Sequence, residues 1–342
     1  MTSEGAPRVL GWDIGGVNVK VARDDGPSAS APLAMQHDAA ALPDTLRSLG
    51  AGLGHRRGVP HAVTMTAELS QAFRTKREGV GFVLDAMAAA FPDDPVHVFL
   101  VDGCFVTPAE ARRRPLDAGA SNWMATAVLV AQFVPDGLLI DIGTTSTDII
   151  PLVAGRPCPA GRTDPARLLS GELVYTGAVR TPAEALVREV PLWGGHAPVA
   201  AEGFATVGDA HVWLGRLDPS DYTVPTADGR PPTRVFAGER LARVVCGDRE
   251  MLDDPAIAGI ARALVEAQLQ LVTQGVRRVR ARCRDPGVAA TAGLGDFIAA
   301  EAARRAGLEP VPIGRWLGES GRTAPAAAVA RLLAGQLGGR RP

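Results

Sequence analysis

Residues 11–20 read GWDIGGVNVK, and residues 141–150 read DIGTTSTDII. Each stretch places an Asp, an apolar residue and a Gly turn between apolar segments, which is the pattern of two strands joined by a tight turn. The flanking segments predict strands at 8–13, 17–23, 138–142 and 147–153. The same unit therefore opens each half of the chain, and this repetition predicts a duplicated α/β fold.

The length of 342 residues exceeds the size at which a single core usually stops growing, so we expect two lobes. We place the N-terminal lobe at 1–135 and the C-terminal lobe at 136–342, with an irregular insertion, rich in Gly, Pro and Asp, around 194–238. Apolar periodicity predicts further strands at 62–66, 96–101 and 287–291 and helices at 68–91, 257–279, 297–305 and 325–337.

Helix starts are marked by capping patterns. Thr107 and Thr181 each precede Pro-Ala-Glu, which is a capping box with Pro at the first helical position. Ser121 is expected to cap the helix that runs to Phe133. Asn122, directly after this cap, is a candidate for substrate contact, with a purely structural role as the alternative.

Composition excludes several function classes. The formal net charge of −1 argues against a general nucleic-acid binder, which would show a clustered basic face. The four cysteines lack zinc-like spacing, the six histidines are scattered, and no Gly-x-Ser-x-Gly occurs, so a zinc site and a serine hydrolase are disfavoured. Without a leader or an apolar run of membrane-spanning length, we expect a cytoplasmic protein with no membrane partner.

Three glycine turns are candidate phosphate sites, because a glycine lets backbone N–H groups approach an anion closely. The predicted phosphate-binding residues are Gly15, Gly16 and Asn18 in the first turn, Gly143, Thr144 and Thr145 in the second, and Gly293 and Gly295 in a third turn between strand and helix. Ordinary hairpin turns are the alternative. Two matching loops and a third turn make a chance match less probable than for one motif.

Asp13 and Asp141 would repel a bare phosphate, so their presence in the two loops predicts a bridging Mg²⁺ held by both carboxylates. Whether ATP also binds stays open. The chain has two lysines, Lys20 and Lys76, among 36 basic residues. Lys20 leaves the first loop and suits phosphate. Lys76 is a candidate substrate-binding residue, as is Tyr175, although a solvent-facing loop and aromatic packing are the respective alternatives.

The three turns resemble the phosphate-1, phosphate-2 and adenosine motifs of the actin, sugar kinase and Hsp70 superfamily. Within it, residues 141–149 are similar to the hydantoinase A/oxoprolinase branch. Further stretches resemble the family of methanofuran biosynthesis synthases of tetrahydromethanopterin-linked C1 pathways, and the resemblance spans about residues 8 to 335. These stretches are TAEL at 66–69, TKREGV at 75–80, ASNW at 120–123, LVYTG at 173–177, RTP at 180–182 and DREM at 248–251.

The resemblance implies a two-lobed actin-like ATPase fold, made of duplicated ribonuclease-H-like domains with an interlobe cleft. It implies a transferase of methanofuran or methylofuran biosynthesis that joins an aminomethylfuran-methyl diphosphate to the phenol of a tyramine- or tyrosine-type precursor, forming an ether and releasing diphosphate. The guest of the phosphate loops would then be the diphosphate of a substrate. A single Gly-x-Gly at 293–295, where nucleotide-binding relatives show a fuller glycine cluster, weighs against adenine.

In this mechanism Asp13, Asp141 and Lys20 would stabilise the departing diphosphate, and a carboxylate would take the phenol proton. Glu68, Glu78 and Asp102 are the candidates, with Glu68 assigned to the catalytic set. An ATP-dependent small-molecule kinase or oxoprolinase-like hydrolase would use the same loops for ATP. A non-catalytic nucleotide-responsive regulator is the second alternative.

Overall fold

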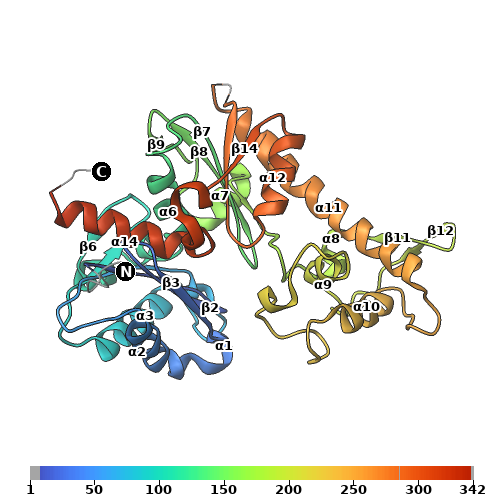
Figure 1. Ribbon diagram of the computed structural model, residues 1–342, viewed down its shortest axis with the longest axis horizontal. Coiled ribbons are helices and arrows are strands. Elements are labelled where there is room, and N and C mark those ends of the chain that lie inside the picture. The colour runs from blue at the N-terminus through green and yellow to red at the C-terminus, as the bar shows by residue number, and fades with distance from the viewer. Residues whose placement is uncertain (1–7, 285, 340–342) are drawn as a thin grey trace, which may run out of the picture. The chain divides into compact units, whose positions relative to one another are not determined.

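The computed structural model describes residues 8–284 and 286–339 (Figure 1). The described residues form two compact units. The first unit holds the chain up to Leu139, Ile150–Arg167 and the chain from Val311, and the second holds Ile140–Ile149 and Leu168–Pro310. The predicted boundary at 135/136 divides the sequence into its two duplicated halves, and it stays a prediction.

The first sheet has the strand order β3-β2-β1-β4-β5-β6. Its strands are β1 (Leu10–Ile14), β2 (Asn18–Arg23), β3 (Ser28–Pro32), β4 (His61–Met65), β5 (Val96–Phe99) and β6 (Phe105–Val106). The first three strands form an antiparallel meander, whereas β1, β4 and β5 are parallel. The predicted hairpin around the first glycine loop is confirmed.

The second sheet has the order β10-β8-β7-β13-β14. Its strands are β7 (Gly137–Ile142), β8 (Thr147–Val153), β10 (Leu173–Val174), β13 (Val288–Ala292) and β14 (Glu309–Pro312), with β9 (Arg156–Pro157) paired to β8 at the side. In both sheets the first strand of the set lies in the middle, with the second and third strands on one side and the fourth and fifth on the other. This shared order confirms the duplicated α/β fold.

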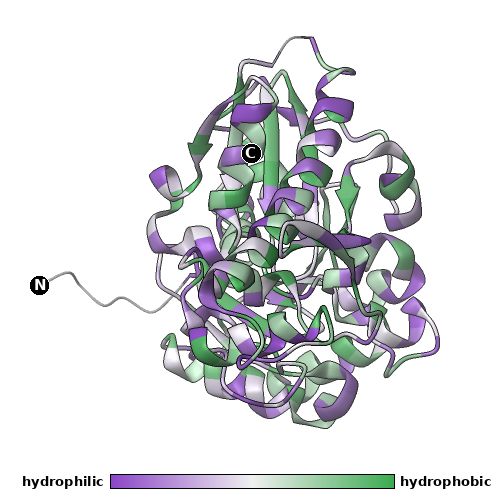
Figure 2. Ribbon diagram, turned by 90° about the vertical axis from the view of Figure 1, so that its right-hand side faces the viewer, coloured by the Kyte–Doolittle hydropathy of each residue, from purple (hydrophilic) through white to green (hydrophobic). Residues whose placement is uncertain are grey.

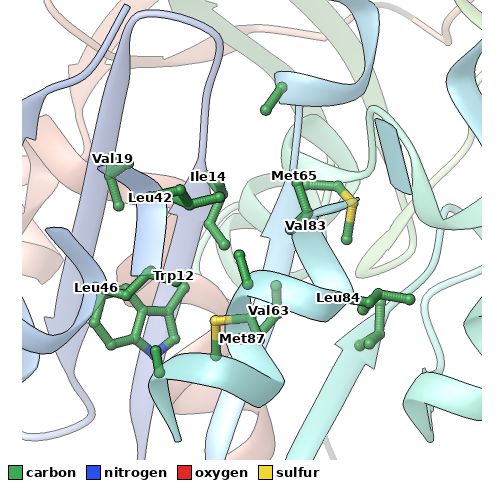
Figure 3. Close-up of a cluster of buried hydrophobic side chains, with 14 of the residues drawn as sticks. Trp12, Ile14, Val19, Leu42, Leu46, Val63, Met65, Val83, Leu84 and Met87 are labelled. Atoms are coloured by element: carbon green, nitrogen blue, oxygen red, sulfur yellow. The ribbon is translucent and has the colours of Figure 1, made fainter. Parts of the chain in front are cut away.

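Helices of the first unit cover the first sheet. They are α1 (Met35–Asp38), α2 (Leu42–Gly52), α3 (Lys76–Ala90), α4 (Pro108–Arg113), α5 (Pro115–Ala118), α6 (Asn122–Val130), α13 (Gly314–Leu317) and α14 (Ala324–Leu337), with 3-10 turns η1 (Ala39–Ala41), η2 (Ala67–Leu69) and η4 (Gly318–Thr323). Alternate residues of a strand face opposite sides of a sheet. Accordingly, Trp12 and Ile14 pack with α2 and α3 (Figure 3), whereas Gly11 lies against α14, where a Cβ would meet the Ala326 carbonyl oxygen at 2.1 Å.

Helices of the second unit are α8 (Ala183–Leu186), α9 (Val207–Trp213), α10 (Arg234–Arg243), α11 (Asp254–Arg280) and α12 (Asp296–Arg305), with η3 (Pro219–Asp221). The helix α7 (Asp164–Ser170) contains the point where the chain passes between units. A hairpin of β11 (Glu189–Leu192) and β12 (Gly195–Pro198) precedes α9. The segment expected to be irregular, 194–238, thus holds β12, α9 and the start of α10.

The helix α11 is the only one among the described residues that is long and apolar enough to cross a membrane, a property that the sequence reading missed. Half of its most apolar window is buried within the protein. It packs against α9, α12 and β11, and Figure 2 shows hydrophilic and hydrophobic residues alternating along the helices, while the strands are mainly hydrophobic. We therefore interpret α11 as an amphipathic core helix.

One of the three predicted caps, Thr107, makes a side-chain cap bond. Thr107 caps α4 as expected by accepting from the Glu110 N–H. Thr181 is not a cap, because Pro182 is the N-cap residue of α8 and the Thr181 hydroxyl bonds to Thr176. Ser121 is the N-cap residue of α6 as expected, but its hydroxyl bonds to Thr64 and makes no cap bond.

Candidate active site

The carboxyl ends of β1 and β4 form one edge of the first sheet. These strands are parallel, and Ile14 lies opposite Met65. The chain therefore leaves both strands at the same edge, where the Thr66 N–H donates to the Ile14 carbonyl at 2.9 Å. Because ligands of α/β sheets bind outside the carboxyl ends of strands, this edge of the first unit is the candidate site. It places the first glycine loop beside Glu68, which follows β4 in η2.

The first glycine loop is closed by its own backbone. The Gly15 N–H donates to the Asn18 carbonyl at 3.0 Å, and a Cβ on residue 15 would lie 2.8 Å from that oxygen. At Gly16, by contrast, a Cβ would meet no heavy atom within 4 Å. Glycine at 15 is required by the turn, whereas glycine at 16 leaves the backbone open to a ligand.

Asp13 and Lys20 are cross-strand partners on β1 and β2, and the Lys20 Nζ lies 3.2 Å from the Asp13 Oδ2. The Asp13 residue is only 4% exposed. Its Oδ1 is buried and accepts no hydrogen bond from the residues that the structure describes. A buried carboxylate with one oxygen unused by the protein suits a cation, so Asp13 fits the magnesium prediction within its own unit.

Glu68 is the most unusual carboxylate of this edge. Its side chain is 1% exposed, and within the described chain neither carboxyl oxygen has a hydrogen-bond partner. Two glycines make room for it: a Cβ on Gly79 would lie 2.5 Å from the Glu68 Cα, and one on Gly119 would lie 2.9 Å from its Cγ. Burial raises the pKa of Glu68 to about 7, although the positive charge of Lys76 partly offsets this effect.

Lys76 and Glu68, which the sequence analysis assigned to different roles, lie together. The Lys76 Nζ is 3.4 Å from the Glu68 Oε1 and 2.6 Å from the Asp164 Oδ2. Burial disfavours the ammonium, but the two carboxylates outweigh this and raise the pKa of Lys76 above its usual value. Asp164 was not foreseen, because it lies 88 residues from Lys76 in the sequence.

The other two candidate bases are occupied. The Glu78 side chain accepts from the Arg74 N–H at 2.9 Å, and the Glu78 N–H donates to the Thr75 hydroxyl that caps α3. Asp102 is bonded to Arg114 at 2.6 Å, and although burial opposes it, this bond helps to hold the pKa of Asp102 below its usual value. Both groups serve local structure, so Glu68 ranks first among the three.

The second glycine loop, in the second unit, closes as the first one does. The Gly143 N–H donates to the Ser146 carbonyl at 3.0 Å, with the same spacing as in the first loop. The segment 177–181 braces it: the Ala178 N–H donates to the Gly143 carbonyl, and a Cβ on Gly177 would lie 2.5 Å from the Thr145 nitrogen. The two loops are therefore equivalent in backbone structure as well as in sequence.

A series of buried polar side chains is hydrogen-bonded to the backbone at Gly177. The Gln268 side chain, on α11, donates to the Gly177 carbonyl at 2.7 Å and to the Thr176 hydroxyl at 3.0 Å. Its Oε1 lies 2.8 Å from the His211 Nε2, which must donate because an amide oxygen can only accept. Burial lowers the pKa of His211 to about 4, so its ring is neutral near pH 7.

The third glycine turn has a structural reason for both glycines. Gly293 has φ of +84°, and a Cβ there would lie 2.3 Å from the Ile142 carbonyl and 2.4 Å from the Asp141 Oδ1. A Cβ on Gly295 would lie 2.5 Å from the Ile142 side chain. Close packing against the end of β7 therefore demands glycine at both positions, whether or not a phosphate binds there. The same packing fixes Asp141, which is 7% exposed.

The remaining predicted substrate residues are Asn122 in the first unit and Tyr175 in the second. Asn122 is the first residue of α6, between buried Ser121 and Trp123. Tyr175 follows β10 in the second unit and is 61% exposed, so it does not pack in a core as the alternative reading required. Their roles stay predictions.

The statement that the histidines are scattered is wrong for one cluster in the first unit. His55 and His61 both contact the Asp94 carboxylate, at 2.7 and 3.3 Å. The three side chains could in principle hold a metal ion. However, the Trp12 Nε1–H donates to the His61 Nδ1 at 2.9 Å, so the proton of the neutral ring must be on Nε2, which faces Asp94. A metal would need that nitrogen deprotonated, and we therefore interpret this cluster as structural.

These features define the class of the protein. It has the mixed α/β fold of actin-like ATPases and sugar kinases, with two sheets of the same strand order. A nucleotide-free structure of acetone carboxylase, from work on ATP-dependent acetone carboxylation, is similar with a TM-score of 0.56 and 13% identity, over 95% of this chain and 69% of that chain. At this identity the likeness concerns the fold.

The chain belongs to the hydantoinase/oxoprolinase family, whose sequence model matches residues 60–336. It is 35% identical, over 96% of this chain and 98% of the relative, to the (4-{4-[2-(gamma-L-glutamylamino)ethyl]phenoxymethyl}furan-2-yl)methanamine synthase of Methanocaldococcus jannaschii. A synthase of the same name from Methanococcus vannielii is 31% identical over 48% of this chain and 73% of the relative.

Proposed function

We propose that this protein is a transferase of methanofuran or methylofuran biosynthesis that forms an aryl furfuryl ether. The chain covers nearly the whole of a relative whose name describes a phenoxymethyl-furan product. The substrates would be an aminomethylfuran-methyl diphosphate and the phenol of a tyramine- or tyrosine-type precursor. Both are small molecules, and the proposed location is the cytoplasm.

The reaction balances with these two substrates alone. The bond between the furfuryl CH₂ and the diphosphate oxygen breaks, and its electron pair leaves with the diphosphate. The phenol oxygen forms the new bond to the CH₂, and its proton passes to a base. Because the furan ring shares the positive charge that develops at the CH₂, departure of diphosphate can precede attack, and the site must exclude competing water.

We propose that Glu68 is the base that takes the phenol proton. Glu68 is buried, pairs with Lys76 at 3.4 Å, accepts no hydrogen bond from the described residues and has a pKa near 7. Such a carboxylate is costly to keep unless it has a use. A base with a pKa near the working pH combines a large ionised fraction with a strong affinity for the proton. Glu68 has these properties, and it lies at the edge of the sheet that holds the first glycine loop.

The first loop would bind the diphosphate. Gly15, Gly16 and Asn18 supply a tight turn with open space at Gly16, and Lys20 supplies a positive charge. Asp13 would hold Mg²⁺ through its unused oxygen, and the ion when bound would neutralise charge on the leaving group. In the second unit, Gly143, Thr144, Thr145, Gly293 and Gly295 stay proposed phosphate-binding residues, and Asp141 stays a proposed magnesium ligand.

Lys76, Asn122 and Tyr175 stay proposed substrate contacts. The ammonium of Lys76 also lies beside the proposed base. ATP has no role in the balanced reaction, so we propose that turnover does not require it.

The proposal is tested by incubating the purified protein and Mg²⁺ with the furan diphosphate and a tyramine- or tyrosine-type phenol, with and without ATP. Mass spectrometry should find ether and diphosphate in equal amounts without ATP, formed at least about 100-fold more slowly by Glu68→Gln. Phosphorylated product that forms only with ATP would instead identify a kinase. ATP hydrolysis without ether would favour an oxoprolinase-like hydrolase.

A further inference from the structure

We propose that Asp164 is a positioning residue: it binds the Lys76 ammonium and thereby leaves Glu68 free to accept a proton. This inference rests on the proposed function, because it concerns the base of that reaction. Asp164 would touch no substrate and would act through Lys76.

The two distances from Lys76 are unequal. Its Nζ lies 2.6 Å from Asp164 but 3.4 Å from Glu68. A charge-assisted N–H···O bond has a length of about 2.7–2.9 Å, so Lys76 is bonded to Asp164 and only near Glu68. The ammonium therefore supplies a positive field to Glu68 without using either of its oxygens, which agrees with their lack of hydrogen bonds in the described chain.

Asp164 in turn lies close to a buried arginine. It is the first residue of α7, and its Oδ1 lies 3.8 Å from Nη1 of Arg167. The Arg167 guanidinium stacks on the Trp123 ring at 4.1 Å and is 1% exposed. A buried, stacked arginine loses little further freedom when it pairs with a carboxylate. Trp123 thus contacts Arg167, Arg167 lies near Asp164, and Asp164 bonds to Lys76. This series of contacts holds the Lys76 ammonium in place.

The charges around Glu68 make this arrangement matter. Among the described residues, Lys76 on α3 and Asp164 on α7 are the charged groups that act on it. The neighbouring positions of α3 and of the segment after α5 that pack on it are the glycines Gly79 and Gly119, which bring no charge. After burial, Lys76 has the larger effect and lowers the pKa of Glu68, whereas the negative charge of Asp164 raises it.

Removal of Asp164 would therefore change the base in a defined direction. Without its partner, Lys76 would move to Glu68 and bond to it directly, and the negative charge that opposes ionisation of Glu68 would be lost. Both changes favour the carboxylate and lower its pKa. A weaker base would result, although it would be ionised at lower pH.

The kinetic test is the pH profile of kcat/KM, which reports the pKa of the base in the free enzyme. The wild-type acid limb should lie near pH 7, where Glu68 ionises. In Asp164→Asn it should move to lower pH by about one unit, as expected for a closer opposite charge. In Lys76→Met it should move to higher pH. These opposite shifts would not arise from a general loss of structure, which lowers the whole profile.

Asp85→Asn is the matched control. Asp85 lies on α3 like Lys76, but it pairs at the surface with Arg112. Its removal should leave the acid limb unchanged. Should Asp164→Asn fail to fold, as judged by circular dichroism, Asp164→Ala removes the same charge. An acid limb that stays in place or moves upward when Asp164 is neutralised would overturn the inference.

A second readout does not need turnover. In protein labelled with ¹³C at the glutamate carboxyl carbon, the signal absent from Glu68→Gln belongs to Glu68, and its titration midpoint should fall in Asp164→Asn and rise in Lys76→Met. If these midpoints move while no ether forms, the positioning role stands and the proposed function fails. If ether forms while the midpoint of Asp164→Asn does not fall, the positioning role fails alone.

Discussion

At the scale of single residues, the site is defined by one buried carboxylate that accepts no hydrogen bond from the described residues. Glu68 is enclosed by two glycines and has no hydrogen-bond donor within the described chain. Burial of such a group opposes folding whenever it is ionised. Functional sites commonly retain groups of this kind, because the same burial that destabilises the charge makes it a better base.

The first prediction concerns the stability of Glu68→Gln. The folded-state pKa of Glu68, about 7, lies above its usual 4.5, so the folded protein holds this proton more tightly than the unfolded chain. The resulting stabilisation is full below about pH 4.5 and is lost as the pH rises through 7. Relative to wild type, Glu68→Gln should gain up to about 3 kcal/mol between pH 4.5 and 8.5.

Urea unfolding of both proteins at several pH values measures this difference. The sign is the informative part, because a carboxylate stabilised by its surroundings would give the opposite trend. A stability difference between Glu68→Gln and wild type that does not change with pH would show that Glu68 ionises normally, and it would remove the reason for choosing it as the base.

The second prediction uses two glycines of one helix. In Gly79→Ala the new methyl group would lie 2.5 Å from the Glu68 Cα, so η2 must shift. We expect a loss of about 1–3 kcal/mol and a strong loss of turnover. In Gly81→Ala the nearest atom is the end of the Arg112 side chain at 3.6 Å, so stability should rise by up to ~1 kcal/mol.

Thermal unfolding and ether formation of both variants provide the comparison. Because both changes replace a helical glycine by alanine on α3, helix propensity is the same in each case. Equal behaviour of the two variants would mean that the close contact between Gly79 and Glu68 matters neither for stability nor for turnover.

At the scale of elements, the sequence predicted the hairpins and most of the long helices well and the caps poorly. The helix expected at 68–91 was wrong at its start, because α3 begins at Lys76 after the turn η2. The strands on either side of both glycine loops were predicted within two residues, because alternation and a glycine turn are local signals. Thr181 was misassigned, since its hydroxyl bonds to Thr176. Ser121 is the N-cap residue of α6, but its hydroxyl bonds across a tertiary contact to Thr64. Gln268 was missed for the same reason: on α11 it looks like one polar residue of an amphipathic helix.

The third prediction tests Gln268 as the support of the second loop. Gln268→Leu would leave the Gly177 carbonyl, the Thr176 hydroxyl and His211 without their amide partner. The Thr176 hydroxyl keeps its bond to Thr181, so two groups lose their partner. Buried polar groups left unpaired cost about 1–3 kcal/mol each, and we therefore expect a loss of about 3 kcal/mol. Gln270→Leu is the control, because this exposed neighbour on the same helix bonds only weakly, at 3.3 Å, to Glu266.

Hydrogen exchange of the amides at 143–146 and 177–181 reports the local effect, and urea unfolding reports the global one. Faster exchange in Gln268→Leu, but not in Gln270→Leu, is the expected result. Similar exchange in both variants would show that the loop does not depend on the side chain of Gln268.

At the scale of the whole molecule, repetition is what the sequence revealed most reliably. Two matching loops predicted two sheets, and both sheets have the same strand order, with the first strand of each in the middle. The candidate site was predicted only in part. Glu68 and Lys76 were named separately, but their proximity and the partner Asp164 depend on a contact across 88 residues, which no local pattern encodes.

The sharpest test of the proposed ether-forming reaction follows the oxygen atom of the phenol. Wild-type protein, Mg²⁺, the furan diphosphate and an ¹⁸O-labelled phenol are incubated without ATP, in parallel with Glu68→Gln. We predict that wild type forms an ether that retains ¹⁸O and releases unlabelled diphosphate, while Glu68→Gln is slowed by at least about 100-fold, as expected when a general base is lost. An unlabelled ether, or equal rates for both proteins, would contradict the proposed reaction.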